Sequence, residues 1–400
     1  MRAHFAEVDE FELAEESPLP PGARRQDDCP FEQQLGLEEA PAPEEATLTP
    51  LQQLLKLCGQ ELITDKLPSM TDLLGQHVDL TQIRKIGEGT FGEAFKAGKV
   101  VFKIVPMEGS RLVNGEVQKL SAEILAEVAI SLTLSELRGK PGGSGPFGNS
   151  NITSGFVETY GVGICRGAYA EALCREWHAW DARNESENDP VDDFPGDQLY
   201  VVFVVADGGA DLEHFEVRSF KEAKSILLQV ALTLAVAEEA CQFEHRDLHW
   251  GNLLIQRGAT GTAHFRLRDT SIEMADAGVA VTLIDFTLSR LNTVTGEVAF
   301  LDLSADPELF QGPKGDCQAE TYRRMKKATK DHWEAHRPET NTLWMHYLAD
   351  TMLTLKKFPC SSADKRELRN FRKRALTYGS CGELVWDEFF SGSWLAGAAS

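Results

Sequence analysis

The segment His245–Asn252 (HRDLHWGN) constrains this chain more than any other feature. It follows the long apolar stretch Phe220–Cys241, predicted to be a core helix, and precedes the apolar run Leu253–Ile255, so it is predicted to be a tight loop. An Asp and an Asn five residues apart on such a loop divide two tasks. Asp247 can accept a hydroxyl proton, and Asn252 can offer an amide oxygen to a hard divalent cation. The segment therefore predicts acid–base and metal-binding chemistry.

A further carboxylate, Asp285, follows 38 residues after Asp247, in the apolar sequence Leu283–Thr287. A carboxylate at the end of an apolar strand can bind Mg²⁺ against nucleotide phosphates. We therefore predict Asn252 and Asp285 as metal ligands. Phe286 and Thr287 are predicted to lie beside the nucleotide, and His245 and Arg246 are predicted to support the loop from behind.

A glycine-rich sequence, Gly87–Gly92, reads GEGTFG. A dinucleotide-binding turn needs a helix directly after its third glycine, but a strand-like segment and a Gly98 turn follow here. The loop is therefore predicted to lie across a hairpin, where glycines let backbone N–H groups approach phosphates. A plain β-turn is the alternative. The predicted nucleotide contacts of this region are Ile86, Gly87, Glu88, Gly89, Thr90, Phe91, Gly92, Glu93 and Ala94.

Lys103 lies inside the apolar strand-like segment Val100–Val105, where a lysine is costly to bury unless it is paired. It is either an edge-strand lysine that faces water or a phosphate ligand held by a carboxylate. Glu123 and Glu127 lie one turn apart on the predicted helix Lys119–Leu137, and spacing does not choose between them. The glycine loop, the strand lysine, the helix glutamate, the HRD sequence with its Asn and the metal-binding Asp together match the order of protein-kinase motifs.

The fold class that this pattern predicts is α+β, a two-lobed protein-kinase-like fold with a β-rich N-lobe and an α-rich C-lobe. Three short strands form an antiparallel meander, Leu199–Val205 is a buried strand, and mostly helical segments follow Cys241 as far as about Phe390. An N-terminal helix within Thr47–Cys58 is predicted to be capped by Thr49. The meander strands are Ile83–Ile86, Glu93–Lys96 and Val100–Val105. The predicted parts are an acidic disordered tail (1–46), a helical extension (47–80), the N-lobe with insertions (81–207, with a loop at 140–150) and the C-lobe (208–400).

The net charge of −22 is distributed unevenly. Residues 1–46 hold 13 acidic and 3 basic residues with six prolines, a composition typical of disorder. Residues 184–213 hold nine acids and no Lys or Arg, and residues 297–320 hold six acids and one Lys. This balance disfavours binding to nucleic acid or anionic membranes through the whole surface and favours a basic partner. The apolar stretches are too short to span a bilayer, and the acidic N-terminus does not resemble a signal peptide.

The chain from about Thr47 onward resembles the haspin family of atypical eukaryotic protein kinases. FEHRDLHWGN is distinctive, because most kinases have Lys at the position of His249, and Thr287 replaces the final Gly of the usual DFG. The resemblance also rests on Ile86–Glu93, Leu112–Gly115 (LVNG), Ala223–Leu227, Leu234–Glu238, Ile284–Leu291, Tyr322–Lys327 and Leu343–Leu348.

This resemblance implies a monomeric serine/threonine kinase that uses ATP and Mg²⁺ to phosphorylate a threonine in the histone H3 N-terminal tail. It implies location in the nucleus and on mitotic chromosomes, and activity without activation-loop phosphorylation. It selects Glu127 as the partner of Lys103 and gives His249 the task of neutralising the transferring phosphoryl group. It places Ala206, Asp207, Gly208 and Asp211 at the nucleotide, although Ala206–Asp207 departs from the usual Glu-Phe hinge. The implied docking residues for the basic tail are Asp211, Glu213, Asp306, Glu308 and Asp316.

Four alternatives remain open from the sequence. Asp306-Pro307-Glu308 can be a degenerate APE motif instead of part of a docking surface. The chain can be a pseudokinase scaffold that binds a basic histone tail, an aminoglycoside-type small-molecule kinase, or an acidic histone-binding module without chemistry. The presence of Lys103, Asp247, Asn252 and Asp285 disfavours the scaffold, and the glycine loop and HRD triplet disfavour the small-molecule kinase.

Overall fold

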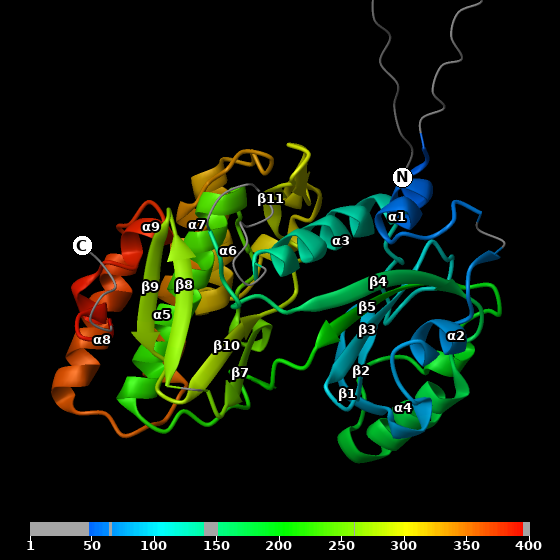
Figure 1. The fold of residues 1–400 in the computed structure, drawn as a ribbon, viewed down its shortest axis with the longest axis horizontal. Helices are drawn as coiled ribbons and strands as arrows, with labels where there is room; N and C mark the ends of the chain where they lie inside the picture. The colour runs from blue at the N-terminus through cyan, green and yellow to red at the C-terminus, as the bar shows by residue number, and fades with distance from the viewer. Residues whose placement is uncertain (1–47, 64–65, 140–150, 260, 395–400) are drawn as a thin grey trace, which may run out of the picture. The chain divides into compact units, whose positions relative to one another are not determined.

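The structure is a computed structural model that describes residues 48–63, 66–139, 151–259 and 261–394. The tail predicted for residues 1–46 and the loop predicted at 140–150 lie outside the described residues. From Leu48 onward the chain forms one compact unit. Within that unit Figure 1 shows a β-rich lobe beside a largely helical lobe, which confirms the predicted fold class.

The β-rich lobe is built on a five-stranded antiparallel sheet of order β1-β2-β3-β5-β4. The glycine-rich sequence joins β1 to β2 in a tight hairpin with Gly89 opposite Gly92, as the absence of a following helix predicted. Its strands are β1 (Arg84–Gly89), β2 (Gly92–Ala97), β3 (Val100–Met107), β4 (Thr159–Arg166) and β5 (Leu199–Ala206).

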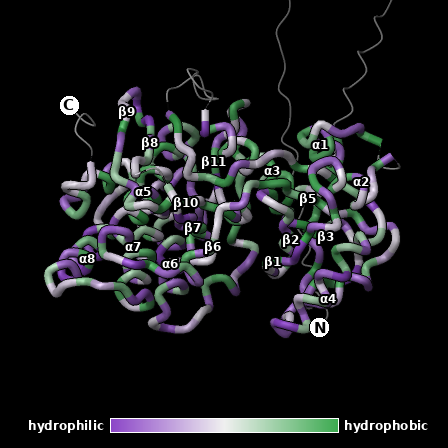
Figure 2. Tube along the Cα trace, turned by 60° about the horizontal axis from the view of Figure 1, so that its bottom comes forward, coloured by the Kyte–Doolittle hydropathy of each residue, from purple (hydrophilic) through white to green (hydrophobic). Residues whose placement is uncertain are grey.

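Helices cover both faces of this sheet, which explains why β5 is apolar throughout rather than alternating. Val201 and Phe203 pack with α1 (Pro50–Leu57) and α3 (Ser121–Glu136). Tyr200, Val202 and Val204 face the opposite side, against α2 (Met70–Gly75) and α4 (Glu171–Asn184), because successive strand residues alternate sides. Figure 2 shows the hydrophobic colouring that runs through β5. The predicted capping of the first helix is confirmed, since the Thr49 side chain accepts the Gln52 N–H at 3.3 Å.

The helical lobe is organised around α5 (Phe220–Cys241), whose 22 residues match the predicted apolar helix. Most side chains of α5 are buried, so the helix lies inside the largest apolar cluster of the described residues. The helices around it are α6 (Cys317–Thr329), α7 (Glu339–Thr354), α8 (Ser362–Ala375) and α9 (Cys381–Leu384).

The expectation of mostly helical segments after Cys241 is wrong for residues 253–300, which contain six strands. These strands are short and lie between turns, so their apolar residues did not show a strand period distinct from that of helices. They are β7 (Leu253–Arg257), β8 (Thr262–Leu267), β9 (Thr270–Ala275), β10 (Val279–Leu283), β11 (Arg290–Asn292) and β12 (Val298–Phe300); β6 (Ala210–Asp211) pairs with β7.

Short 3-10 turns complete the path of the chain, and α3 contacts β12 across the two lobes. No helix among the described residues is long and apolar enough to cross a membrane. The 3-10 turns are η2 (Leu80–Gln82), η3 (Val191–Asp193), η4 (Trp250–Asn252), η5 (Leu303–Ala305), η6 (Glu308–Phe310) and η7 (Glu388–Phe390).

Candidate active site

The loop between α5 and β7 is anchored by charged residues that are completely buried. Arg246 has a left-handed backbone (φ 65°), and its Nε donates to the Glu244 carboxylate at 3.1 Å. Its Nη2 donates to the Trp333 carbonyl at 2.7 Å. The His245 N–H donates to Asn341 Oδ1 at 3.0 Å, which ties the loop to α7. This buried support fixes the backbone on which the next residue, Asp247, is presented.

Asp247 and Asn252 face each other across the loop. Asn252 Nδ2 donates to the Asp247 carbonyl at 2.8 Å and to Asp247 Oδ2 at 3.4 Å, which leaves the Asn252 side-chain oxygen available to a cation. The second carboxylate oxygen of Asp247 accepts a hydrogen bond from the Tyr322 hydroxyl of α6. Burial raises the pKa of Asp247 to about 8, against the opposing effect of the Tyr322 hydrogen bond.

Asp285 lies just after β10 in a left-handed backbone conformation (φ 60°). Its Oδ1 accepts hydrogen bonds from the Thr287 N–H at 3.2 Å and from the Thr287 hydroxyl at 2.7 Å. Its Oδ2 lies 3.4 Å from Lys103 Nζ. Burial acts to raise the pKa of Asp285, but Lys103 and the Thr287 hydrogen bonds outweigh it and hold the pKa well below the usual range. Lys103 and the Thr287 hydrogen bonds thus keep the carboxylate in its ionised form.

Lys103 lies on β3, an interior strand of the sheet, so the edge-strand interpretation is wrong. Its Nζ donates to Glu127 Oε1 of α3 at 2.9 Å. Glu123 instead accepts the Leu120 N–H at 2.8 Å and caps the start of α3. Burial lowers the pKa of Lys103, but the Asp285 and Glu127 carboxylates together raise it above its usual value. The lysine is therefore a fixed cation between the two lobes.

The residues that the sequence singles out fit a divalent cation. Asp285 supplies an ionised carboxylate, and Asn252 has a free amide oxygen because its nitrogen is already bonded to Asp247. Carboxylate and amide oxygens are the ligands that Mg²⁺ prefers. Lys103, about one third exposed at its side chain, lies beside them as a cation for phosphate.

A family model, described as the haspin-like kinase domain, matches residues 35–377. The chain belongs to this haspin-like kinase family. The family prediction made from the sequence motifs is therefore confirmed.

Curated haspins from distant organisms are similar to this chain. It is 47% identical over 343 residues to a serine/threonine-protein kinase haspin homolog of Arabidopsis thaliana, covering 86% of this chain and 55% of that protein. It is 39% identical over 318 residues to the serine/threonine-protein kinase haspin of Mus musculus, covering 76% and 41%. For the haspin homolog of Drosophila melanogaster the identity is 36% over 292 residues, covering 70% and 50%. The chain thus spans about half the length of these relatives.

The hinge of this haspin-like domain follows β5. The Ala206 N–H donates to the Glu158 carbonyl at 2.8 Å, and the Asp207 N–H donates to the Lys99 carbonyl at 3.0 Å. The Asp207 carboxylate pairs with Lys96 Nζ of β2 at 2.5 Å. The Gly208 N–H has no backbone acceptor among the described residues, so it is the predicted hinge donor that remains for an adenine ring. The unusual Ala-Asp sequence thus changes hinge side chains while keeping one backbone donor.

His249 occupies the position where most kinases have lysine, and its Nδ1 accepts the Gly251 N–H at 3.1 Å. A neutral imidazole with an accepting Nδ1 carries its proton on Nε2. Burial lowers the pKa of His249, and the carboxylates of Asp285, Glu213 and Asp211 oppose that shift without reversing it. In the free protein His249 therefore offers an N–H donor at Nε2, and its predicted role toward the transferring phosphoryl group stays a prediction.

The predicted docking acids fall in two places. Asp211 and Glu213 follow the hinge, close enough to His249 to influence its pKa. Asp211 also accepts a hydrogen bond from His214 Nδ1 at 2.8 Å, and Lys356 Nζ donates to the Glu213 backbone carbonyl at 3.1 Å, so among the described residues the Asp211 carboxylate is used locally and the Glu213 carboxylate is not.

The other docking acids precede or begin α6, the helix that presents Tyr322 to Asp247. Asp306 and Glu308 are exposed, as a docking surface requires, and the described residues show no ion pair to Glu308. The Asp306 carboxylate accepts the Glu308 N–H at 3.1 Å, and Asp316 caps α6 by accepting the Ala319 N–H at 2.7 Å. Part of the Asp306 carboxylate and part of the Asp316 carboxylate are therefore used locally.

Two residues near the site escaped the sequence reasoning. Tyr322 lies in a motif used for the resemblance, but no spacing connects it to Asp247, 75 residues earlier. Lys119 Nζ lies 3.8 Å from Glu127 Oε2, on the side of the carboxylate away from Lys103. A lysine just before a helix gives no sequence signal, because its place depends on how the preceding segment folds back.

Proposed function

We propose that this protein is an ATP-dependent serine/threonine kinase that phosphorylates a threonine of the basic histone H3 N-terminal tail. The observation that carries the proposal is the junction between the lobes, where Lys103 contacts Glu127 at 2.9 Å and Asp285 at 3.4 Å. That junction joins β3, α3 and the end of β10 in one arrangement suited to holding a triphosphate and a metal.

The residues at this site divide the work of phosphoryl transfer. Lys103, oriented by Glu127, holds the α- and β-phosphates of ATP. Asn252 and Asp285 hold Mg²⁺, which supplies charge neutralisation for the phosphates when it is bound. Asp247 positions the substrate hydroxyl and accepts its proton as the oxygen attacks the γ-phosphorus and the bond to ADP breaks. His249 donates its Nε2–H to the transferring group.

Tyr322 supports the base by occupying one carboxylate oxygen of Asp247. Since a carboxylate oxygen that already accepts a hydrogen bond from a hydroxyl is a weaker base, the proton of the substrate is directed to the other oxygen, which lies next to Asn252. The tyrosine thus orients the catalytic carboxylate from outside the catalytic loop.

The substrate class follows from charge and from the family. The relatives are named serine/threonine-protein kinase haspin, and exposed acids such as Asp306 and Glu308 favour a cationic peptide. Action on histone tails implies location in the nucleus and on mitotic chromosomes, which is part of the same proposal.

The buried Arg246 supports activity without phosphorylation of the activation segment. Phosphorylated segments act by recruiting an arginine. Here Glu244 and the Trp333 carbonyl already occupy Arg246 inside the core, so the catalytic loop is ordered without a phosphate.

The proposal is tested by transfer of radiolabelled phosphate from ATP to an array of histone H3 tail peptides with free or N-acetylated termini. Wild-type protein should label the tail threonine and prefer the free, more basic terminus. Asp247→Asn and Lys103→Ala should fold normally and lose transfer by at least about 100-fold, because each removes a group that acts on the reacting phosphate. Full activity in either variant would exclude the assignment.

A pseudokinase scaffold is the second candidate, favoured by the Ala206–Asp207 departure from the usual hinge. It predicts that Mg·ATP raises the melting temperature or that the tail binds, while no peptide is labelled. A thermal-shift assay run beside the transfer assay separates the two.

A further inference from the structure

The tip of the glycine-rich loop is held by side chains from two distant segments. The first segment follows α4, and its Asn188 Nδ2 donates to the Gly89 carbonyl at 3.1 Å. The same nitrogen donates to Glu93 Oε1 at 2.9 Å, so Asn188 ties the turn to the start of β2. Beside it, Ser186 Oγ donates to the Glu88 carboxylate at 2.7 Å.

The second segment is the family motif Leu112–Gly115, to which the proposed chemistry gives no role. Positive φ angles at Asn114 (52°) and Gly115 (88°), with Val113 and Glu116 bonded to each other, make it a two-residue hairpin turn. Its Asn114 Nδ2 donates to the Thr90 carbonyl at 2.9 Å.

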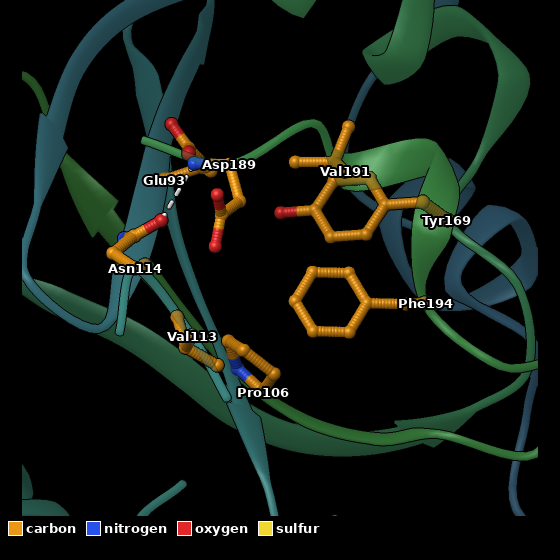
Figure 3. A pocket seen from close by; sticks show the side chains of 9 residues that line it. Glu93, Pro106, Val113, Asn114, Tyr169, Asp189, Val191 and Phe194 are labelled. Atoms are coloured by element: carbon orange, nitrogen blue, oxygen red, sulfur yellow. Dashed lines mark hydrogen bonds between the residues drawn. The ribbon is translucent and has the colours of Figure 1, made fainter. Parts of the chain in front are cut away.

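The two segments are also bonded to each other. Asn114 Oδ1 accepts the Asp189 N–H at 2.7 Å, a contact that Figure 3 shows on the wall of a small pocket beside Glu93. The Asn114 amide therefore uses its nitrogen on the loop and its oxygen on the segment that carries Asn188. Gln118 anchors the base of the hairpin by accepting the Gly109 N–H at 2.8 Å.

A third contact reaches Phe91, the next residue of the tip. Lys119 Nζ lies 4.9 Å from the centre of the Phe91 ring, a cation–π distance. Because Lys119 Nζ also lies 3.8 Å from Glu127 Oε2, it connects the loop to the glutamate that holds Lys103. Three consecutive tip residues thus each have a fixed partner.

These contacts orient the loop amides toward the phosphate site. In a trans peptide the C=O and the following N–H point in opposite directions. Drawing the carbonyls of Gly89 and Thr90 toward Asn188 and Asn114 therefore turns the N–H groups of Thr90 and Phe91 the other way. Neither N–H has a backbone acceptor among the described residues, so both are available to a phosphate.

We propose that Asn188, Asn114 and Lys119 are positioning residues that hold the glycine-rich loop in its phosphate-binding conformation without help from nucleotide. The inference rests on the proposed use of ATP, but none of the three contacts involves a nucleotide atom. The triphosphate of ATP then binds to a loop that is already ordered, which removes part of the entropic cost of binding.

The test uses the full chain and two readouts that do not require phosphoryl transfer. Hydrogen–deuterium exchange of peptides covering 84–97 in nucleotide-free protein reports the order of the β1–β2 hairpin. Calorimetric titration with Mg·ATP reports affinity. Asn188→Ala should speed exchange in this hairpin and weaken ATP binding about fivefold, the size of effect expected for losing the hydrogen bond to the Gly89 carbonyl, which orients the loop. Asn370→Ala, on the exposed side of α8, is the matched control and should change neither readout.

Asn114→Gly keeps the hairpin turn, because glycine accepts positive φ, and removes only the side chain. It should reproduce Asn188→Ala, and Asn114→Asp, which keeps the oxygen but loses the donor to Thr90, should do the same. Unchanged exchange and unchanged ATP affinity in these variants would overturn the proposal, even if the wild type labels histone peptides. Conversely, altered exchange in a protein that labels no peptide would leave the loop assignment intact and refute the proposed function.

Lys119→Met should also speed exchange in the hairpin, and Lys119→Arg should restore it, because an arginine keeps the cation over Phe91. Weaker ATP binding with unchanged exchange would show that Lys119 contacts phosphate directly and would overturn its assignment as a positioning residue. Lys373→Met, on an exposed face of α8, controls for loss of a positive charge.

Discussion

The catalytic loop and the glycine-rich loop both place irregular backbone against the predicted phosphate site, but different forces hold them. In the catalytic loop, Glu244, His245 and Arg246 are completely buried and bonded to core elements. In the glycine-rich loop, Gly89 and Thr90 are exposed, and their carbonyls are held by two asparagines from distant segments.

This difference separates stability from function. A buried anchor belongs to the core, so breaking it exposes an unpaired charge and weakens the whole fold. A surface hydrogen bond contributes little to global stability, yet it can decide whether a loop is ordered. Substitutions in the catalytic-loop support should therefore lower unfolding free energy, whereas those at the glycine-loop tip should mainly change nucleotide affinity.

The largest effect is expected for Glu244→Ala. The Glu244 carboxylate also accepts the Arg337 N–H at 2.7 Å and the Thr340 hydroxyl at 2.9 Å, so its loss leaves three donors unpaired, two of them buried. We expect the free energy of unfolding in urea to fall by about 3–5 kcal/mol. The double variant Glu244→Met/Arg246→Met should recover part of the loss. A change below about 1 kcal/mol in the single variant would contradict the buried-anchor interpretation.

A second buried ion pair lies directly under the glycine-rich loop. This loop therefore also has a contact that contributes to the stability of the whole fold. Lys85 Nζ is fully buried between Glu93 and Glu88, 5.4 Å from the centre of the Trp177 ring. Lys85→Met should lower the unfolding free energy by about 3 kcal/mol, because the Glu93 carboxylate loses its cation in the interior. Chemical denaturation measures the loss, and Lys99→Met, at an exposed turn, is the control. A loss as small as that of the control would show that water replaces the lysine.

The same contrast explains what the sequence could predict. The catalytic loop, α5 and the β1–β3 meander follow from apolar periodicity and from motifs whose members are close in the chain. Asn114 is 24 positions from Thr90 in the sequence, and Asn188 is 99 positions from Gly89. Tyr322 and Asp247 are 75 positions apart. Such pairs depend on how insertions fold back, which no local pattern encodes.

A count of charges does not show which acids of the stretch 184–213 are free for docking. Asp211 and Glu213 are its predicted docking residues, and several of the other acids are used within the protein. Asp193 pairs with Arg111 at 3.2 Å, and Asp207 pairs with Lys96 at 2.5 Å. A run of like charges in sequence is separated in space once a strand and a hinge pass through it, so the stretch does not act as one surface, and Asp211 and Glu213 stay its predicted docking residues.

Glu238 lies in the buried support behind the catalytic loop, and the dependence of the unfolding free energy on pH tests its contribution. Its buried carboxylate accepts Asn341 Nδ2 at 2.9 Å, and burial raises the pKa of Glu238 to about 7. The folded protein therefore holds this proton more tightly than the unfolded chain, which stabilises the fold at low pH. That contribution is lost as the pH rises from about 4.5 through 7.

Glu238→Gln removes this dependence while keeping an acceptor for Asn341. Relative to the wild type, the variant should gain about 2 kcal/mol of unfolding free energy between pH 5 and pH 8. Histidine titrations are common to both proteins and cancel in the difference. Parallel curves of stability against pH would show that the pKa of Glu238 is not raised.

Tyr322→Phe tests a contact that acts on the catalytic loop from outside it. Losing the hydroxyl should lower kcat about tenfold, equivalent to about 1.4 kcal/mol, with little change in KM for ATP. Because the Tyr322 hydrogen bond lowers the pKa of Asp247, its loss should also move the acidic limb of the kcat/KM profile to higher pH. If kcat and the dependence of kcat/KM on pH are both unchanged, Tyr322 contributes only packing and does not orient Asp247. Tyr378→Phe, in the C-lobe, is a control whose hydroxyl bonds Asp387 instead.

The smallest effect is expected at the hinge, where Lys96 and Asp207 form a partly exposed ion pair. Their side chains are 35% and 19% exposed, and pairs of this kind contribute about 0–1 kcal/mol. Lys96→Met should raise the KM for ATP less than about threefold and should leave the unfolding free energy within about 0.5 kcal/mol of the wild type. A loss of affinity equal to that of Asn188→Ala would mean that the hinge pair also fixes the nucleotide site. The glycine-loop asparagines would then be one part of a wider polar framework over the phosphates, rather than a separate device.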